Sequence, residues 1–149
     1  MKLEDEIKQK KFRNEFHKLA VNIIYTHGWL INKQSSFLKK HGITEAQFNI
    51  LRILRGQYPN PSSINLLKER MLDKMSDASR LVDRLLQKGL VDRKICPDDR
   101  RRVEVVITEK GLELLNEIDK YNDEMDKIFD NISHDEARTL NNLLDKMRG

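Results

Sequence analysis

A change of hydrophobic period at Gly89 is the feature that most constrains the fold of this chain. Before it, residues 74–88 repeat apolar side chains at intervals of three and four, which places one set on a single helix face: Ala78, Leu81, Val82, Leu85 and Leu86. The opposite face of this helix is polar: Ser76, Arg80, Asp83, Arg84 and Gln87. After the glycine, the segments LVDRKI and RVEVVI alternate apolar and polar residues, as strands do. The pattern therefore predicts an amphipathic helix that ends at a glycine and leads directly into a β-hairpin.

The tip of this hairpin is strongly charged. In CPDDRRRVEVVITEKG, two aspartates and three adjacent arginines, residues 98–102, separate the two predicted strands. Neighbouring arginines repel each other and add nothing to an apolar core, so the tip lowers folding stability unless an anion neutralises it. The minor groove of DNA offers such an environment, because its potential is strongly negative. Considered alone, a solvated turn with incidental charge explains the tip equally well.

The segments before the amphipathic helix complete a recognisable motif. A helix is predicted to begin at ITEAQF, where Thr44 and Gln47 can form a capping box. YPNP ends this helix, and SSINLLKERM predicts a short helix capped by Ser62 or Ser63. Helix, short helix, turn, amphipathic helix and hairpin, in this order, indicate a winged helix-turn-helix. In such a motif the second helix of the pair enters the major groove of DNA.

The regions outside this motif are predicted to be long helices, each with one apolar stripe. Residues 4–34 carry the first stripe: Phe12, Phe16, Leu19, Ile23 and Leu30. Thr108 caps a second long helix with its own stripe: Leu114, Ile118, Tyr121, Met125, Ile128 and Ile132. Ser133 and Glu136 begin a final helix with a capping box. A small domain cannot cover helices of this length, so we expect a second chain to pack against them.

The polar helix face and the hairpin tip hold the candidate DNA contacts. They are Ser76, Asp77, Ser79, Arg80, Arg84, Asp99, Arg100, Arg101 and Arg102. Arg80 is placed to bind a guanine or a phosphate, and the serines are able to bind base edges or the backbone. Asp99 is expected to accept a hydrogen bond from an arginine guanidinium and to hold it in position.

Three stretches of the chain resemble the DNA-binding region of MarR-family (multiple antibiotic resistance) regulators: ITEAQFNILRIL, SDASRLVDRLLQKGLVDR and PDDRRRVEVVITEKG. The family's wing carries an Asp-x-Arg signature, followed by a strand and a Thr-x-x-Gly helix start. Asp99, Arg101, Thr108 and Gly111 correspond to these positions. Asp77 departs from the family pattern, in which a small neutral or hydroxyl residue is common, and a carboxylate near phosphates is unfavourable.

The resemblance implies a mainly α fold with a small β-hairpin wing, in the α+β class. It also implies a homodimer, which supplies the partner that both apolar stripes need. Residues 1–35 are then expected to form an N-terminal dimerisation helix, residues 36–110 the winged DNA-binding domain, and residues 111–149 the C-terminal dimerisation helices.

Family members often bind small aromatic or phenolic anions between the dimerisation helices and the DNA-binding domain, so the resemblance implies a ligand pocket there. His17, Tyr25 and Trp29 are the candidate lining residues of this pocket. The alternative for Tyr25 and Trp29 is that they are ordinary packing residues.

Composition and charge distribution argue against several other classes. Residues 1–110 contain 23 Lys and Arg against 14 Asp and Glu, whereas residues 111–149 contain 5 against 10. The first part therefore permits an anionic partner, and the acidic end is not expected to face one. No apolar run approaches the roughly 20 residues of a membrane span, and the N-terminus lacks the apolar core of a signal peptide. Because a lone cysteine fits a reducing compartment, we expect a cytoplasmic protein with no membrane partner.

No catalytic set, glycine-rich phosphate loop or metal-ligand pair occurs in the sequence, so we expect a non-enzyme without cofactor or metal. Together with the winged helix-turn-helix pattern, the resemblance implies a homodimeric transcriptional regulator, a repressor released by a small aromatic ligand. Its operator is expected to be a pseudo-palindromic DNA duplex with half-sites about 10 bp apart. Two alternatives stay open: a winged-helix module that binds an acidic protein partner, and a redox sensor that acts through Cys96.

Overall fold

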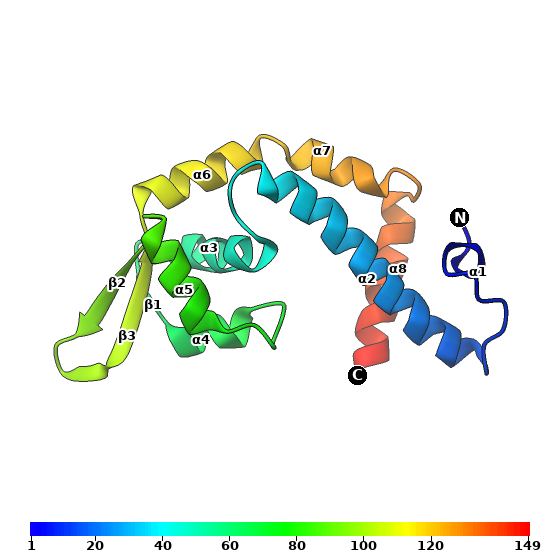
Figure 1. Ribbon diagram of the computed structural model, residues 1–149, viewed down its shortest axis with the longest axis horizontal. Helices are drawn as coiled ribbons and strands as arrows, with labels where there is room; N and C mark the ends of the chain where they lie inside the picture. The colour runs from blue at the N-terminus through cyan, green and yellow to red at the C-terminus, as the bar shows by residue number, and fades with distance from the viewer.

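The chain folds into a lobe, residues 43–107, which carries a small sheet, and an arm, which consists of the helices that precede and follow the lobe (Figure 1). The structure is a computed structural model, and it describes residues 1–149 with the exception of the side chain of Arg100. The helices are α1 (Leu3–Glu6), α2 (Glu15–Lys39), α3 (Glu45–Gln57), α4 (Ile64–Arg70), α5 (Ala78–Gln87), α6 (Glu109–Asp119), α7 (Asn122–Asp126), the 3-10 helix η1 (Lys127–Phe129) and α8 (His134–Arg148). The strands are β1 (Ser62–Ser63), β2 (Val91–Cys96) and β3 (Asp99–Ile107). This order confirms the mainly helical fold with a hairpin wing.

The core of the lobe forms around α3, because most of the neighbouring elements contact this helix. Ile50, Leu51 and Leu54 of α3 are at most 1% exposed. They share one buried cluster with Leu67 of α4 and Leu85 of α5. α3 also contacts α2, α6 and β3. α3 therefore joins the rest of the lobe to α2 and α6, the two helices of the arm that lie next to it.

Four predicted helix starts are confirmed by hydrogen bonds from the first helical turn to the capping side chain. The capping residues are Thr44 with Gln47 for α3, Ser63 for α4, Thr108 for α6 and Ser133 with Glu136 for α8. Each cap satisfies a backbone N–H that has no partner inside the helix. These starts depend on neighbours in the sequence, and for that reason the sequence alone located them.

The hairpin belongs to a three-stranded antiparallel sheet in the order β1–β3–β2. Its base is buried, with Val91 of β2 opposite Ile107 of β3, and its tip pairs Cys96 with Asp99. β1 was not predicted as a strand, because a two-residue segment is too short for an alternating pattern. It pairs with β3 on the side away from β2.

The amphipathic helix begins about one turn later than the sequence pattern predicted. α5 starts at Ala78, because the Asp77 carboxylate accepts a hydrogen bond from the backbone N–H of Arg80 at 3.1 Å and caps the helix. Residues 74–77 belong instead to the connection from α4. The predicted end of the helix is confirmed, since Gly89 has a φ of 73°, a left-handed conformation that glycine adopts without strain.

The N-terminal region contains two helices, so the prediction of one helix over residues 4–34 is wrong. The Asn14 side chain accepts a hydrogen bond from the first turn of α2 and starts that helix there. α1 folds back onto α2, where Glu4 pairs with Lys18. α2 then continues as far as Lys39, beyond the domain boundary expected after residue 35.

The long helix predicted from Thr108 is interrupted after Asp119. α6 buries Leu115 and Ile118 against the lobe. The residues of α7, η1 and α8, all of them described, are exposed or half-buried. The apolar stripe continues past the interruption, but only its first part has a core within this chain to pack against.

Candidate nucleic-acid interface

α5 presents a polar face to solvent because its apolar face is buried in the lobe. Ala78, Val82 and Leu85 are at most 1% exposed, as the helical period predicted. Arg80 and Arg84 lie on the exposed face. The hydrogen bond of Arg80 to Asp77 uses the backbone N–H, so the guanidinium fork remains available for an external acceptor.

Ser76, Asp77 and Ser79, three of the predicted DNA contacts, differ in their positions around the start of α5. Ser79 is exposed in the first turn, whereas Ser76 lies half-buried in the connection. Asp77 caps α5 and does not stand on its polar face, which corrects the expected position. Its carboxylate faces the positive end of the helix, which lowers the electrostatic cost of a negative charge at this site.

An ion pair joins the hairpin to α5. The Arg93 guanidinium on β2 lies 2.9 Å from an Asp83 carboxylate oxygen. The pair holds the hairpin against the exposed side of α5 and neutralises an acidic group on that side. Sequence reasoning missed Arg93, since a single basic residue on an exposed strand face carries no distinctive pattern.

The hairpin tip is held by a backbone contact. The Asp99 carboxylate accepts a hydrogen bond from the backbone N–H of Arg101 at 3.0 Å, whereas the sequence predicted a bond from a guanidinium. An aspartate commonly stabilises a turn by this short-range bond. Arg101 is exposed, and the Arg102 Nε lies 3.9 Å from Glu104 Oε1. The side chain of Arg100, another predicted contact, lies outside the described residues.

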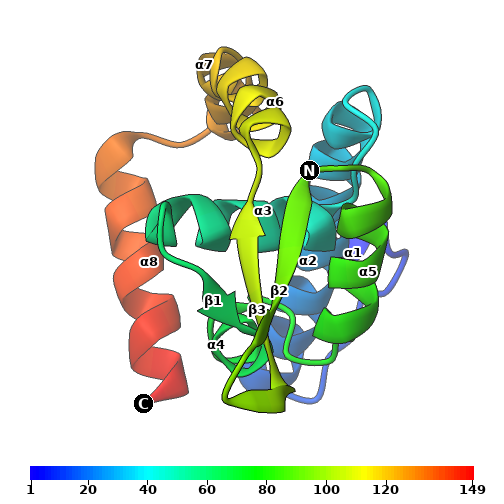
Figure 2. The ribbon, with the colours of Figure 1, turned by 90° about the vertical axis from the view of Figure 1, so that its left-hand side faces the viewer.

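The start of α5 and the tip of the β2–β3 hairpin lie on the same side of the lobe. Figure 1 shows both at the lower side of the molecule, and Figure 2 shows the same arrangement after a 90° turn. Two separate elements that carry exposed arginines, Arg80 on α5 and Arg101 in the hairpin, therefore lie on one side of the lobe. A duplex that approaches this side meets the first turn of α5 and the hairpin tip together.

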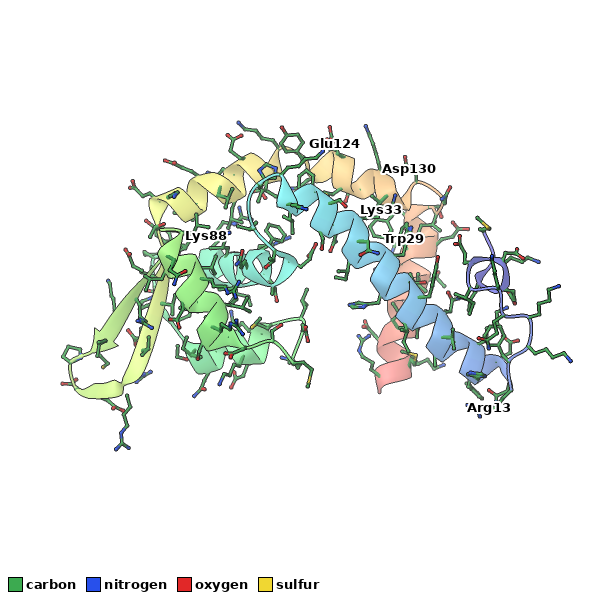
Figure 3. The ribbon with its side chains drawn as sticks, in the orientation of Figure 1. Arg13, Trp29, Lys33, Lys88, Glu124 and Asp130 are labelled. Carbon is green, nitrogen blue, oxygen red and sulfur yellow. The ribbon has the colours of Figure 1, made fainter. Side chains whose placement is uncertain are left out.

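Two of the three predicted ligand residues share a groove, and the third lies at the start of the same helix. Tyr25 and Trp29 line an open groove along α2 and are 37% and 38% exposed. His17 lies at the start of α2, where its Nδ1 accepts a hydrogen bond from the backbone N–H of Arg13 at 3.1 Å. Figure 3 labels Arg13 at that end of the helix and Trp29 farther along it.

A cavity of about 340 Å³ lies between the lobe and the arm. Its lining combines apolar and polar side chains from α2, α3, α6 and α7: Gln34, Phe37, Leu38, Glu45, Phe48, Arg52, Ile118, Asn122, Met125 and Asp126. Among the described residues, Glu45 Oε1 is buried without a hydrogen-bond partner. Burial raises the pKa of the Glu45 carboxyl above its usual value. The Arg52 guanidinium lies 5.6 Å from the centre of the Phe48 ring.

A metal site and a membrane-spanning helix are both absent from the part of the chain that the structure describes. That part contains no cluster of three or more histidine, cysteine or acidic side chains able to hold a metal ion. None of its helices has the length and apolar character to cross a membrane. Cys96 is a free, half-buried thiol at the end of β2.

Comparison with known proteins gives one consistent result. Residues 43–103 match the model of the MarR family. HTH-type transcriptional regulator MhqR of Bacillus subtilis (strain 168) is 28% identical over 131 residues, which cover 87% of this chain and 89% of that protein. HTH-type transcriptional repressor IacR of Pseudomonas putida is 28% identical over 142 residues, which cover 95% of this chain and 80% of that protein.

A solved structure is similar to this chain along nearly its whole length. The crystal structure of a mutant MarR from E. coli complexed with operator DNA is 26% identical and superposes with a TM-score of 0.81, covering 93% of this chain and 99% of that one. These similar proteins are transcriptional regulators, not enzymes. The resemblance noted in the sequence is confirmed, because residues 43–103 match the MarR family model and the fold is that of MarR winged-helix structures.

Proposed function

We propose that this protein is a transcriptional repressor that binds operator DNA through α5 and the β2–β3 hairpin. The observation that carries the proposal is the common orientation of the α5 start and the hairpin tip (Figures 1 and 2), with Arg80 and Arg101 exposed on them. α5 fits the major groove, which is about 12 Å wide, and the arginines of the hairpin then lie near the minor groove. The similar fold of a MarR bound to operator DNA supports this placement.

The binding unit in this proposal is a homodimer joined through the arm. Large apolar side chains are exposed there, including Phe16 at 79%, Ile24 at 72% and Leu140 at 51%. A second copy of the chain would bury these surfaces and bring two α5 helices into a two-fold arrangement. The operator is then pseudo-palindromic, with half-sites about 10 bp apart.

Selection of bound duplexes from a randomised DNA library tests this proposal. We expect a pseudo-palindromic site, whose affinity is then measured by fluorescence anisotropy at several salt concentrations. Arg80→Ala should cost about 1–3 kcal/mol of binding free energy and relax the preference at one base pair per half-site. Arg101→Ala should weaken binding to most sequences and reduce the salt slope by about one.

Arg138→Ala is the matched control, because it removes the same charge from an exposed site on α8. It should leave the affinity and the salt slope unchanged. Failure to select any duplex, or an equal effect of all three substitutions, would contradict the proposed interface.

We further propose that a small amphipathic cation binds the cavity between α2, α3 and α6 and regulates DNA binding. The unpaired Glu45 oxygen supports this choice, because a buried carboxylate is stabilised by a donor or a positive charge. The Phe37 ring offers an apolar and cation–π contact, and the Phe48 ring, which already lies 5.6 Å from the Arg52 guanidinium, offers an apolar one. This charge preference differs from the aromatic or phenolic anion that the family resemblance implies.

Benzylamine and benzoate form a matched pair of probes, since they share a ring and differ in charge. Benzylamine should raise the melting temperature of the protein and alter its affinity for the selected duplex, whereas benzoate should do neither. Glu45→Gln should remove the response to benzylamine. A stronger response to benzoate would contradict the cationic ligand and leave the DNA-binding proposal intact.

A further inference from the structure

We propose that Met75 and Leu72, in the connection between α4 and α5, recognise thymine methyl groups beside the recognition helix. This inference rests on the proposed function, since it names a base feature that the same surface recognises. Met75 is 93% exposed and Leu72 is 88% exposed. Two large apolar side chains with so little cover leave apolar surface free to contact another molecule.

The connection holds its backbone in place while these two side chains project from it. The backbone N–H of Leu72 donates to Asn49 Oδ1 of α3 at 2.9 Å, and that of Met75 donates to Asp73 Oδ1 at 2.9 Å. The preceding residue, Met71, is 3% exposed and belongs to the core. The exposed side chains therefore stand on a fixed segment, which lowers the entropy cost of a specific contact.

The connection also lies next to the proposed DNA-binding surface. It leads directly into the first turn of α5, and Figure 1 shows it on the lower side of the lobe with the start of that helix. A duplex that accepts the first turn of α5 in its major groove meets this connection at the groove edge.

The charges around Met75 and Leu72 favour a nucleic acid over an apolar partner. The neighbouring cations are Lys68, Arg70, Lys74 and Arg80, and the neighbouring carboxylates are Glu69, Asp73 and Asp77. Two of these carboxylates, those of Asp73 and Asp77, accept hydrogen bonds from backbone N–H groups. Four cations against three carboxylates, two of them bonded to the backbone, leave a small positive excess beside the apolar pair, which suits a base edge flanked by phosphates.

Thymine is the base that an apolar pair of side chains is able to recognise in the major groove. In the major groove, each base pair presents donors and acceptors, and only thymine adds a methyl group. A methionine side chain is unbranched and adapts its shape to the surface it meets. The operator should therefore contain a fixed thymine in each half-site within reach of the connection.

Replacement of thymine by uracil tests this contact, because it deletes the methyl group and keeps the pairing. Each fixed thymine of the selected operator is replaced symmetrically in both half-sites, and the affinity of the protein is measured. At the contacted position, uracil should weaken wild-type binding about three- to fourfold per methyl, the factor expected for one buried methyl group. Met75→Gln, which keeps the side-chain length, should bind the two duplexes equally, and Met75→Leu should still prefer thymine. Leu72→Gln is measured in the same way.

Arg80→Ala serves as the control, since it should weaken binding to both duplexes and keep the preference for thymine. The inference is overturned if the selected operator has no fixed thymine, if uracil has no effect on the wild type, or if Met75→Gln and Leu72→Gln both keep the preference. Sedimentation without DNA adds a second criterion: loss of self-association in Met75→Gln would assign the patch to a contact between copies and overturn the inference. If the wild type binds no duplex, the proposed function fails as well, whereas every other negative result leaves it standing.

Discussion

The lobe and the arm differ in where their apolar side chains are buried. In the lobe, Leu51 and Leu67 are completely enclosed by other elements of the same chain. In the arm, Phe16, Ile24 and Leu140 are between half and four-fifths exposed. Burial of apolar surface therefore stabilises the lobe, whereas much of the apolar surface of the arm stays in contact with water. This contrast teaches that the lobe is stabilised within one chain, whereas the arm keeps apolar surface exposed that the proposed dimer would bury.

The largest expected effect comes from a cavity in the core of the lobe. Leu51→Ala removes a completely buried side chain of α3 and should lower the free energy of unfolding by about 3 kcal/mol. Urea denaturation followed by circular dichroism, at two protein concentrations, measures the loss. The loss should be the same at both concentrations, because the lost contacts lie within one chain. A loss that changes with dilution would contradict the contrast between lobe and arm.

A smaller loss is expected from Gly111→Ala at the base of α6. A Cβ atom at this position would lie 2.4 Å from the Leu90 carbonyl oxygen and 2.6 Å from Ile107 Cγ1. Both neighbours belong to the packed base of the hairpin, so the substitution should cost about 2 kcal/mol through overpacking. Gly56→Ala is the control, because no atom lies within 4 Å of the added Cβ. Equal stabilities of the two variants would refute the close approach of α6 to the hairpin.

Leu140→Glu should act on the arm and spare the lobe. It places a charge on an exposed apolar position of α8 and should weaken the proposed dimer roughly tenfold or more, on the order of 1–2 kcal/mol. Sedimentation velocity over a dilution series measures the dimer dissociation constant. Asn142→Glu, about half a turn away on α8, adds the same charge and should have little effect. A dimer that tolerates Leu140→Glu would remove α8 from the interface.

The sequence located those features of the lobe that depend on neighbouring residues. Thr44 and Ser133 were identified as helix caps because a cap bonds to the backbone of its own first turn. The polar face of α5 followed from helical periodicity, so Arg80 and Arg84 were placed on its exposed side. The start of α5 was misplaced, since several polar residues compete as caps and only the tertiary packing selects Asp77.

The lengths of the helices in the arm were harder to predict, because α6 ends where the buried core of the lobe ends. The stripe that includes Ile118 continues with the same period beyond Asp119, yet α6 stops there. Periodicity reports which side of a helix is apolar but carries no information on the length of the surface it meets. Met75 and Leu72 were missed for a related reason, since an isolated apolar residue in a connection resembles a core residue until its exposure is known.

The smallest expected effect concerns the ion pair that joins α3 to the end of α6. The Arg55 Nη1 lies 2.7 Å from Asp119 Oδ2, and the two side chains are 29% and 40% exposed. A partly exposed pair gains little, because solvent and salt screen it, so a double-mutant cycle with Arg55→Ala and Asp119→Ala should give about 0.5 kcal/mol of coupling. The coupling should fall further in 1 M salt, where the Debye length is only about 3 Å. A coupling of several kcal/mol would mean that this pair, and not the packing of Leu115 and Ile118, joins the lobe to the arm.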